Sequence, residues 1–269
     1  MSLIETLNDF LLVCLVFVPL ERLLALRPGQ RILRRGWIVD LVHVFATGFL
    51  YRLGLILLVV ALGGALEGVV PEAVRRAAGS QPIWLAVIEI ILIADIGFYF
   101  VHRALHASPV LWRFHAIHHS IEEMDFLAAH RVHPIDQLLS RGATLLPVLA
   151  LGFAPEAIAL FAVMYHWHAL LIHSNVRLGI GPLRWIIASP VYHHWHHANQ
   201  PEAIDKNFAG QLVLLDLLFG TLHLPRRERP RRYGTDTPVP RSYFGQLLHP
   251  FKRSPTTPAA RRDGVVGGA

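Results

Sequence analysis

Long apolar segments set the pattern of the chain and predict a bundle of membrane helices. They cover residues 3–20 (with 11–20 as the core), 37–66, 83–101, 138–153 and 155–172. The second and third segments are long enough to cross an apolar core of about 30 Å. Because only a short linker separates the last two segments, they are expected to form a helical hairpin. We therefore expect an all-α integral membrane fold with about four membrane-crossing or hairpin helices and a cytoplasmic, histidine-rich helical cap.

Features within these segments refine the prediction. The first segment lacks the cationic start and small-residue cleavage site of a signal peptide, so it is interpreted as a retained helix. Residues 212–219 form a last apolar patch that is too short to span a membrane. Ionisable residues deep within the longer runs are few, namely Arg52, Glu89 and Asp95. Such groups are costly at membrane depth and usually face the protein interior or a polar cavity.

Composition supports residence in a membrane. The 269 residues are 53% apolar and 16% charged, whereas soluble domains carry about 25% charged residues, and the mean hydropathy is +0.42. These values exclude a disordered, collagen-like or coiled-coil protein. The only cysteine is Cys14, which excludes a disulfide framework, a cysteine-ligated zinc and an iron–sulfur cluster. The net charge of +6 does not indicate nucleic acid, because the arginines cluster beside apolar runs.

The placement of the arginines predicts the orientation in the membrane. One cluster lies in residues 22–35 and another in residues 226–232. The charges in residues 67–76 sum to zero. Positive loops remain in the cytoplasm, so both clusters are expected there. The segments that start at His102 and His173 then lie at the cytoplasmic surface, most simply of a bacterial inner membrane.

Three regions are expected along the chain. Residues 1–82 form the N-terminal transmembrane helices, residues 83–225 form a histidine-rich catalytic domain, and residues 226–269 form a basic tail rich in Pro, Arg and Gly. The tail is expected to be partly disordered, above all at Gly264 to Ala269.

Histidine is the unusual residue type, with 17 in the chain. Four clusters hold most of them: His102 and His106; His115, His118 and His119; His166, His168 and His173; His193, His194, His196 and His197. Spacings of three and four residues place imidazoles on one helical face. Neutral imidazole binds iron, copper, zinc or nickel. Eight or nine such rings are too many for one ion and fit two ions with open positions. The isolated His43, His223 and His249 are assigned no role.

Other polar residues leave alternatives open. His130 and His133 are interpreted as hydrogen-bond partners of the ligands or as loop residues, rather than as ligands. Asp95 lies seven residues before His102 on roughly the same face, so it either accepts a ligand N–H or satisfies a neighbouring helix. The acidic residues after the second cluster are interpreted as a solvated face: Glu122, Glu123 and Asp125.

With these motifs in view, the chain resembles the fatty acid hydroxylase/sterol desaturase superfamily of integral-membrane di-iron enzymes. The resemblance covers about half of the chain, from Ile91 to Leu224. The family pattern H-x3-H, H-x2-HH and H-x2-HH is matched in order: His102 and His106; His115, His118 and His119; His193, His196 and His197. Flanking pieces also match, such as Arg131-Val-His133-Pro134 and Asp205-Lys-Asn-Phe208.

The resemblance implies a centre of two iron ions that uses O2 to oxidise a C–H bond of a lipid. The implied ligands are His102, His106, His115, His118, His119, His193, His196, His197 and, as a ninth, His173. His168 and His194 depart from the family pattern and remain alternative ligands or hydrogen-bond partners. Sterol, fatty acyl, sphingoid, ether-lipid and carotenoid substrates all stay open, as does hydroxylation versus desaturation.

Electrons for this chemistry are expected from an external donor. The chain lacks a nucleotide-binding G-x-G-x-x-G and a cysteine cluster, so a ferredoxin, a cytochrome or a reduced pterin would serve. The competing interpretation is a histidine-rich membrane protein that binds or transports a metal. It is disfavoured because the histidines gather at helix ends on one side, with few ionisable groups along the apolar segments.

Overall fold

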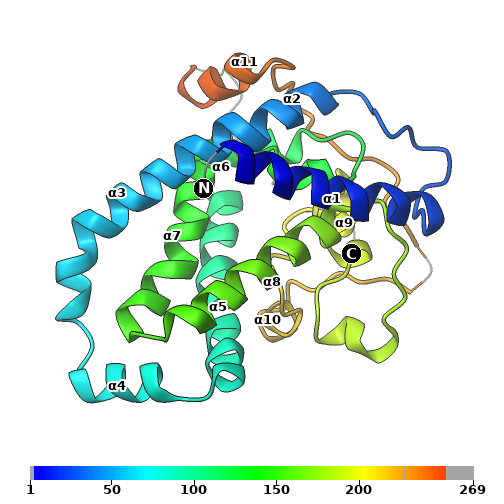
Figure 1. Ribbon diagram of the computed structural model, residues 1–269. Coiled ribbons are helices and arrows are strands. Elements are labelled where there is room, and N and C mark those ends of the chain that lie inside the picture. Colours follow the sequence, from blue (N-terminus) through cyan, green and yellow to red (C-terminus); the bar gives the residue numbers. More distant parts are fainter. Residues whose placement is uncertain (1–2, 227, 253–269) are drawn as a thin grey trace, which may run out of the picture.

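The computed structural model of the protein describes residues 3–226 and 228–252 (Figure 1). The longer helices are α1 (Leu3–Leu23), α3 (Gly48–Glu67), α4 (Glu72–Ser80), α5 (Ile83–Ala107), α6 (Pro109–His119), α7 (Pro134–Leu151) and α8 (Pro155–His173). The shorter ones are α2 (Trp37–Val42), α9 (Pro190–His196), α10 (Leu214–Leu218) and α11 (Tyr243–Leu248). Brief 3-10 turns join them, among them η2 (Phe126–His130), and a π-helical segment, His43–Thr47, links α2 to α3. The described residues contain no β-strand, which confirms the predicted all-α class.

Three helical segments are long and apolar enough to span a membrane. They are Trp37–Leu62, Ile83–Ala107 and Pro155–His173. Within the most apolar 18-residue stretch of the first segment, only 6% of the residues are buried, so most of its apolar surface is available to lipid. The helices α1 and α7 are not among the three. The expected number of about four membrane-crossing or hairpin helices is therefore not confirmed. A short link joins α7 to α8, as predicted, but each of the two helices packs on α5 more than on the other, so they do not form a closely packed hairpin.

The core of the bundle lies between α5, α7 and α8. Ile90 and Ala94 of α5 are buried there against Val148 and Phe161. In Figure 1 the green α7 lies beside α5, with α3 on its other side. The helix α7 carries Asp136 and Arg141 within its apolar sequence. Packing on two sides explains why this helix tolerates polar residues that lipid would not.

Close packing of α5 on α7 depends on Gly97. A Cβ atom at Gly97 would collide with the backbone carbonyl oxygen of Ala143. Gly97→Ala is therefore expected to destabilise the protein by about 1–3 kcal/mol, because backbone must shift to admit the methyl group. Gly54→Ala is the matched control, since a Cβ there would lie 3.5 Å from Leu138 in ordinary contact. Thermal unfolding in detergent measures both, and equal midpoints would contradict the packing argument.

Two short helices that carry histidines, α6 and α9, begin with the same N-terminal cap, a serine followed by a proline. Ser108 and Ser189 precede the prolines that begin α6 and α9. Each serine hydroxyl accepts a hydrogen bond from the backbone N–H three residues further on, in Leu111 and Tyr192. A serine cap followed by proline at the first position favours helix initiation. The caps thus fix where each histidine-bearing helix begins, and with it the direction in which the imidazoles point.

Part of the basic tail is ordered against the bundle. The Gln246 side chain accepts a hydrogen bond from His43 Nε2 at 2.8 Å, and the backbone carbonyl of Leu247 accepts one from His133. In Figure 1 the orange α11 lies at the same end as α2. Gly264 to Ala269, where disorder was predicted, lie outside the described residues.

Candidate metal centre

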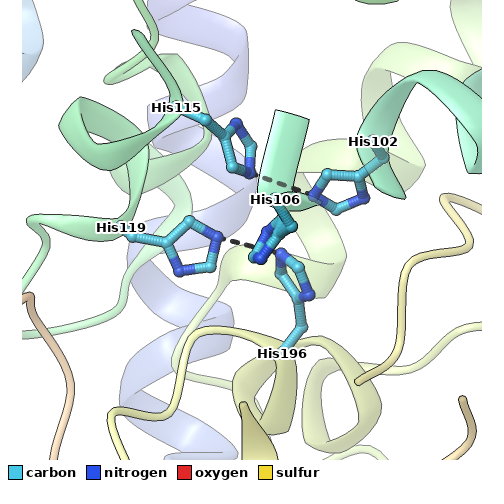
Figure 2. A group of neighbouring side chains, drawn as sticks. All are labelled: His102, His106, His115, His119 and His196. Atoms are coloured by element: carbon cyan, nitrogen blue, oxygen red, sulfur yellow. Dashed lines mark hydrogen bonds between the residues drawn. The ribbon is translucent and has the colours of Figure 1, made fainter. Parts of the chain in front are cut away.

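Nine histidines converge in two adjacent groups. In each group, one potential ligand atom per residue lies within 4.8 Å of every other such atom. The first group contains His102, His106, His115, His119 and His196, and the second contains His118, His173, His193 and His197. Figure 2 shows the first group, with its rings directed toward one another. These nine are the residues that the motif pattern proposed as ligands, although their proximity alone does not test ligation.

Helical spacing divides the histidines between the two groups. On α6, His115 and His119 belong to the first group, and His118 belongs to the second. The last motif has the reverse arrangement, since His193 and His197 belong to the second group and His196 to the first. Each H-x2-HH motif thus contributes to both groups, so neither group can form without both segments.

Hydrogen bonds orient the rings. Four Nδ1 atoms each lie close to a backbone carbonyl oxygen: His102 to Phe208 (2.7 Å), His118 to Arg131 (3.0 Å), His173 to Ala169 (2.7 Å) and His196 to Lys206 (2.9 Å). A carbonyl oxygen can only accept, so in each pair Nδ1 carries the hydrogen. The Nε2 atom of a neutral ring then presents a lone pair.

The Nε2 lone pairs of these rings face one another. This arrangement shows whether a metal ion fits the site. The Nε2 atoms of His118 and His173 lie 3.1 Å apart, and both rings donate through Nδ1. Two bare nitrogens at this distance repel each other unless a cation lies between them. In the first group, dashed lines in Figure 2 join Nε2 of His119 to Nε2 of His196, 3.0 Å apart. The donor set therefore fits metal ions bound through Nε2.

Burial keeps the rings in the form that binds metal. Desolvation, followed by the neighbouring imidazoles, holds the pKa of His118, His119 and His197 well below the usual value of histidine. Burial lowers the pKa of His196 to about 3. These rings are therefore neutral at physiological pH, and a neutral imidazole nitrogen is the ligating species.

A cavity of about 700 Å³ borders both groups. Five of the nine histidines line it, namely His102, His115, His118, His173 and His193. Its other walls include the side chains of Phe98, Tyr165 and Ile172. An apolar ligand in this cavity would lie directly against the imidazole clusters.

Comparison with known proteins identifies the family. The fatty acid hydroxylase family profile matches residues 87–221, half of the chain, and includes all nine histidines. This chain belongs to the fatty acid hydroxylase family. No solved structure is significantly similar to it.

The relatives of this fatty acid hydroxylase family member include a lipid hydroxylase, a monooxygenase and an aldehyde decarbonylase. Ornithine lipid hydroxylase OlsE of Rhizobium tropici is 33% identical over 64% of this chain and 52% of its own length. Alkylglycerol monooxygenase of Xenopus tropicalis is 32% identical over 54% of this chain and 32% of its own length. The very-long-chain aldehyde decarbonylase GL1-1 of rice is 30% identical over 52% and 25%. The match thus covers about half, or less, of each relative.

Asp136 lies beside the first histidine group, and the sequence analysis gave it no role. Its carboxylate is buried and accepts a hydrogen bond from His115 Nδ1 at 2.8 Å. It lies in the first turn of α7, shortly after the His133-Pro134 pair that begins this helix. A carboxylate soon after that motif was the available signal. Ligand histidines commonly donate to such an acceptor, which fixes the ring and raises its basicity.

Asp95 supports the site by binding the backbone of a neighbouring segment. Its carboxylate accepts hydrogen bonds from the backbone N–H groups of Gly210, Gln211 and Leu212. Within the described residues it contacts no histidine by a hydrogen bond, so the structural alternative for Asp95 fits better. The segment that it holds follows Phe208, whose carbonyl orients His102.

The remaining candidate histidines lie outside both groups. His133 caps α7 through Nδ1 and donates to the Leu247 carbonyl, which agrees with the loop interpretation. His168 donates to the carbonyl of Ala188 at 2.9 Å. His194 lies between the Tyr233 hydroxyl and two backbone carbonyls. His130 faces a second cavity.

One sequence interpretation was wrong. Asp125 was assigned to a solvated face, but it is 3% exposed and forms an ion pair with Arg34 at 2.6 Å. Arg34 also pairs with Asp40, and Asp40 pairs with Arg131. Asp125 is buried because its loop folds under the linker that carries Arg34, far away in sequence. The resulting network holds Arg131, whose carbonyl orients His118.

Proposed function

We propose that this chain is an integral-membrane, O2-dependent di-iron enzyme that hydroxylates a C–H bond of a lipid. The convergence of nine buried histidines into two adjacent groups carries the proposal. Imidazole ligands with open positions suit iron, and membership of the fatty acid hydroxylase family supports that metal. The relatives named as hydroxylase and monooxygenase favour hydroxylation over desaturation.

Two iron ions held by these groups would supply the activation of O2, which no side chain of the protein can perform. The first group would hold one ion through five imidazoles and the second would hold the other through four. Asp136 would fix the His115 ring, and the backbone carbonyls would fix four others.

The cavity beside the histidines would bind the lipid. Its aromatic and aliphatic walls, such as Phe98 and Ile172, exclude water and suit an apolar segment of the substrate. The site lies at the ends of α5 and α8, two of the candidate membrane spans. We propose that these ends lie at the cytoplasmic face of a bacterial inner membrane, where an external ferredoxin, cytochrome or reduced pterin can deliver electrons.

Metal content and lipid products test this function together. The purified protein is expected to contain about two irons per chain without haem absorption, because its two groups can hold two ions. Lipid extracts from cells that express the gene should contain a species one oxygen heavier than in cells that lack it. Mass spectrometry measures that shift. Stoichiometric zinc without O2 consumption would instead support the metal-binding or transport alternative.

A further inference from the structure

A second cavity, of about 810 Å³, adjoins the one beside the histidines. It lies between α1, α3, α7, α8 and the short helix η2. The two cavities share lining residues, namely Ala129, Gln137, Arg141 and Ala169. The two cavities therefore lie side by side. An elongated molecule that passes this shared wall would have one part against the histidines and another in the second cavity.

Two arginines line the second cavity without an acidic partner. Arg52 lies within the candidate span Trp37–Leu62, and Arg141 lies on α7. Among the residues that the structure describes, neither side chain forms an ion pair or a hydrogen bond, and Arg141 only stacks over the Tyr165 ring at 4.3 Å. An unpaired guanidinium group within a membrane span, as at Arg52, is costly and marks a binding site or pathway.

Neutral polar side chains complete the lining. Tyr51, Gln137 and the rings of His130 and His166 also face this cavity. Within the described part of the chain, none of the four side chains has a hydrogen-bond partner. The π-helical segment His43–Thr47 precedes Tyr51 by one helical turn, and such segments often occur at functional sites. The cavity thus presents many unused hydrogen-bonding groups to a ligand.

The charge of the lining defines the chemistry of that ligand. Asp9 is its acidic member, but Asp9 is exposed, and the two arginines leave the lining with an excess of positive charge. Guanidinium groups bind carboxylate and phosphate oxygens in bidentate geometry. Because both arginines line the same cavity, an oxyanion bound there could accept hydrogen bonds from both guanidinium groups.

We propose that this second cavity binds the acidic headgroup, a phosphate or a carboxylate, of an anionic lipid substrate. This inference rests on the proposed function, since it assigns the substrate class of that enzyme. The headgroup lies against Arg52 and Arg141, and the adjoining part of the lipid passes the shared wall at Gln137 into the histidine-lined cavity.

Binding of a simple anionic amphiphile tests the proposal without turnover. Monododecyl phosphate is titrated into the purified full chain in maltoside micelles, and calorimetry measures the affinity. Arg52→Gln and Arg141→Gln are each expected to weaken binding by about tenfold or more, because each removes a charged hydrogen-bond donor. Arg22→Gln is the matched control, since Arg22 is exposed on α1 and does not line the cavity. Its affinity should equal that of the wild type.

The outcomes separate the possible ligands. Dodecanol should bind much more weakly than the phosphate, and so should inorganic phosphate. Equal binding of dodecanol, or equal affinities of the three arginine variants, would overturn the headgroup site. Equal binding of inorganic phosphate would assign the cavity to a free oxyanion and overturn the lipid assignment.

Two further measurements keep the result interpretable. Gel filtration and iron content report folding of each variant, and Arg52→Lys, which keeps the charge, should weaken binding less than Arg52→Gln. The titration requires neither O2 nor electrons. A purified chain that holds zinc would contradict the proposed function, whereas a failed titration on an iron-loaded chain would contradict the headgroup site alone.

Discussion

Replacement of His197 by alanine is expected to abolish lipid oxidation and to reduce the iron content from about two ions per chain to about one, because the second group then keeps three of its four imidazoles. His197 is 1% exposed, and its Nε2 lies 3.1 Å from that of His193. Iron analysis and oxygen consumption measure the two effects, and a membrane-fraction assay shows that the variant still inserts.

Another histidine of the same region provides the matched control. His194 lies three residues before His197, but its ring is in neither group and bonds to the Tyr233 hydroxyl and to the backbone carbonyls of His173 and Ser174. His194→Ala should lower stability and keep two irons. The distant His249→Ala should change neither. Normal turnover by His197→Ala, or equal iron loss from His197→Ala and His194→Ala, would show that the ligand assignment is wrong.

Local sequence was sufficient to predict which histidines share a helical face, whereas the convergence of the separate motifs was implied by the family resemblance. Spacings of three and four residues within one helix place imidazoles on one face whatever the tertiary structure, so His115, His118 and His119 were accessible from the pattern. The break between α7 and α8 was equally local, since Gly152 ends α7 in a left-handed conformation and Pro155 begins α8. The apolar pattern of α5 likewise predicted a long helix that ends near His106.

Contacts between residues far apart in the sequence could not be predicted from local spacing. The division of each H-x2-HH motif between two groups depends on how α6 and α9 cross. The burial of Asp125 depends on Arg34, 91 residues away. The pairing of Asp136 with His115 is set by the angle at which α7 leaves the loop. Backbone carbonyls such as that of Phe208 carry no signal in the residue type, although they orient the rings.

Breaking the buried ion network that supports this site is expected to have the second large effect. Asp40 is fully buried and is hydrogen bonded by both Arg34 and Arg131. Asp40→Ala is expected to destabilise the protein by about 3–5 kcal/mol, because Arg131 then remains buried without an acidic partner. Since the Arg131 carbonyl accepts the His118 N–H, the second group should also lose iron more readily to a chelator.

An exposed ion pair of similar chemistry serves as the control. Arg232 and Asp236 pair at 3.1 Å, but both side chains are more than half exposed. Asp236→Ala should therefore cost at most about 1 kcal/mol and leave chelator resistance unchanged. Thermal unfolding in detergent and the rate of iron loss compare the two variants. Equal destabilisation of the two variants, or normal iron retention by Asp40→Ala, would contradict this prediction. Either result would show that the network does not hold the Arg131 carbonyl against His118, because the buried guanidinium would then have found water or another acceptor.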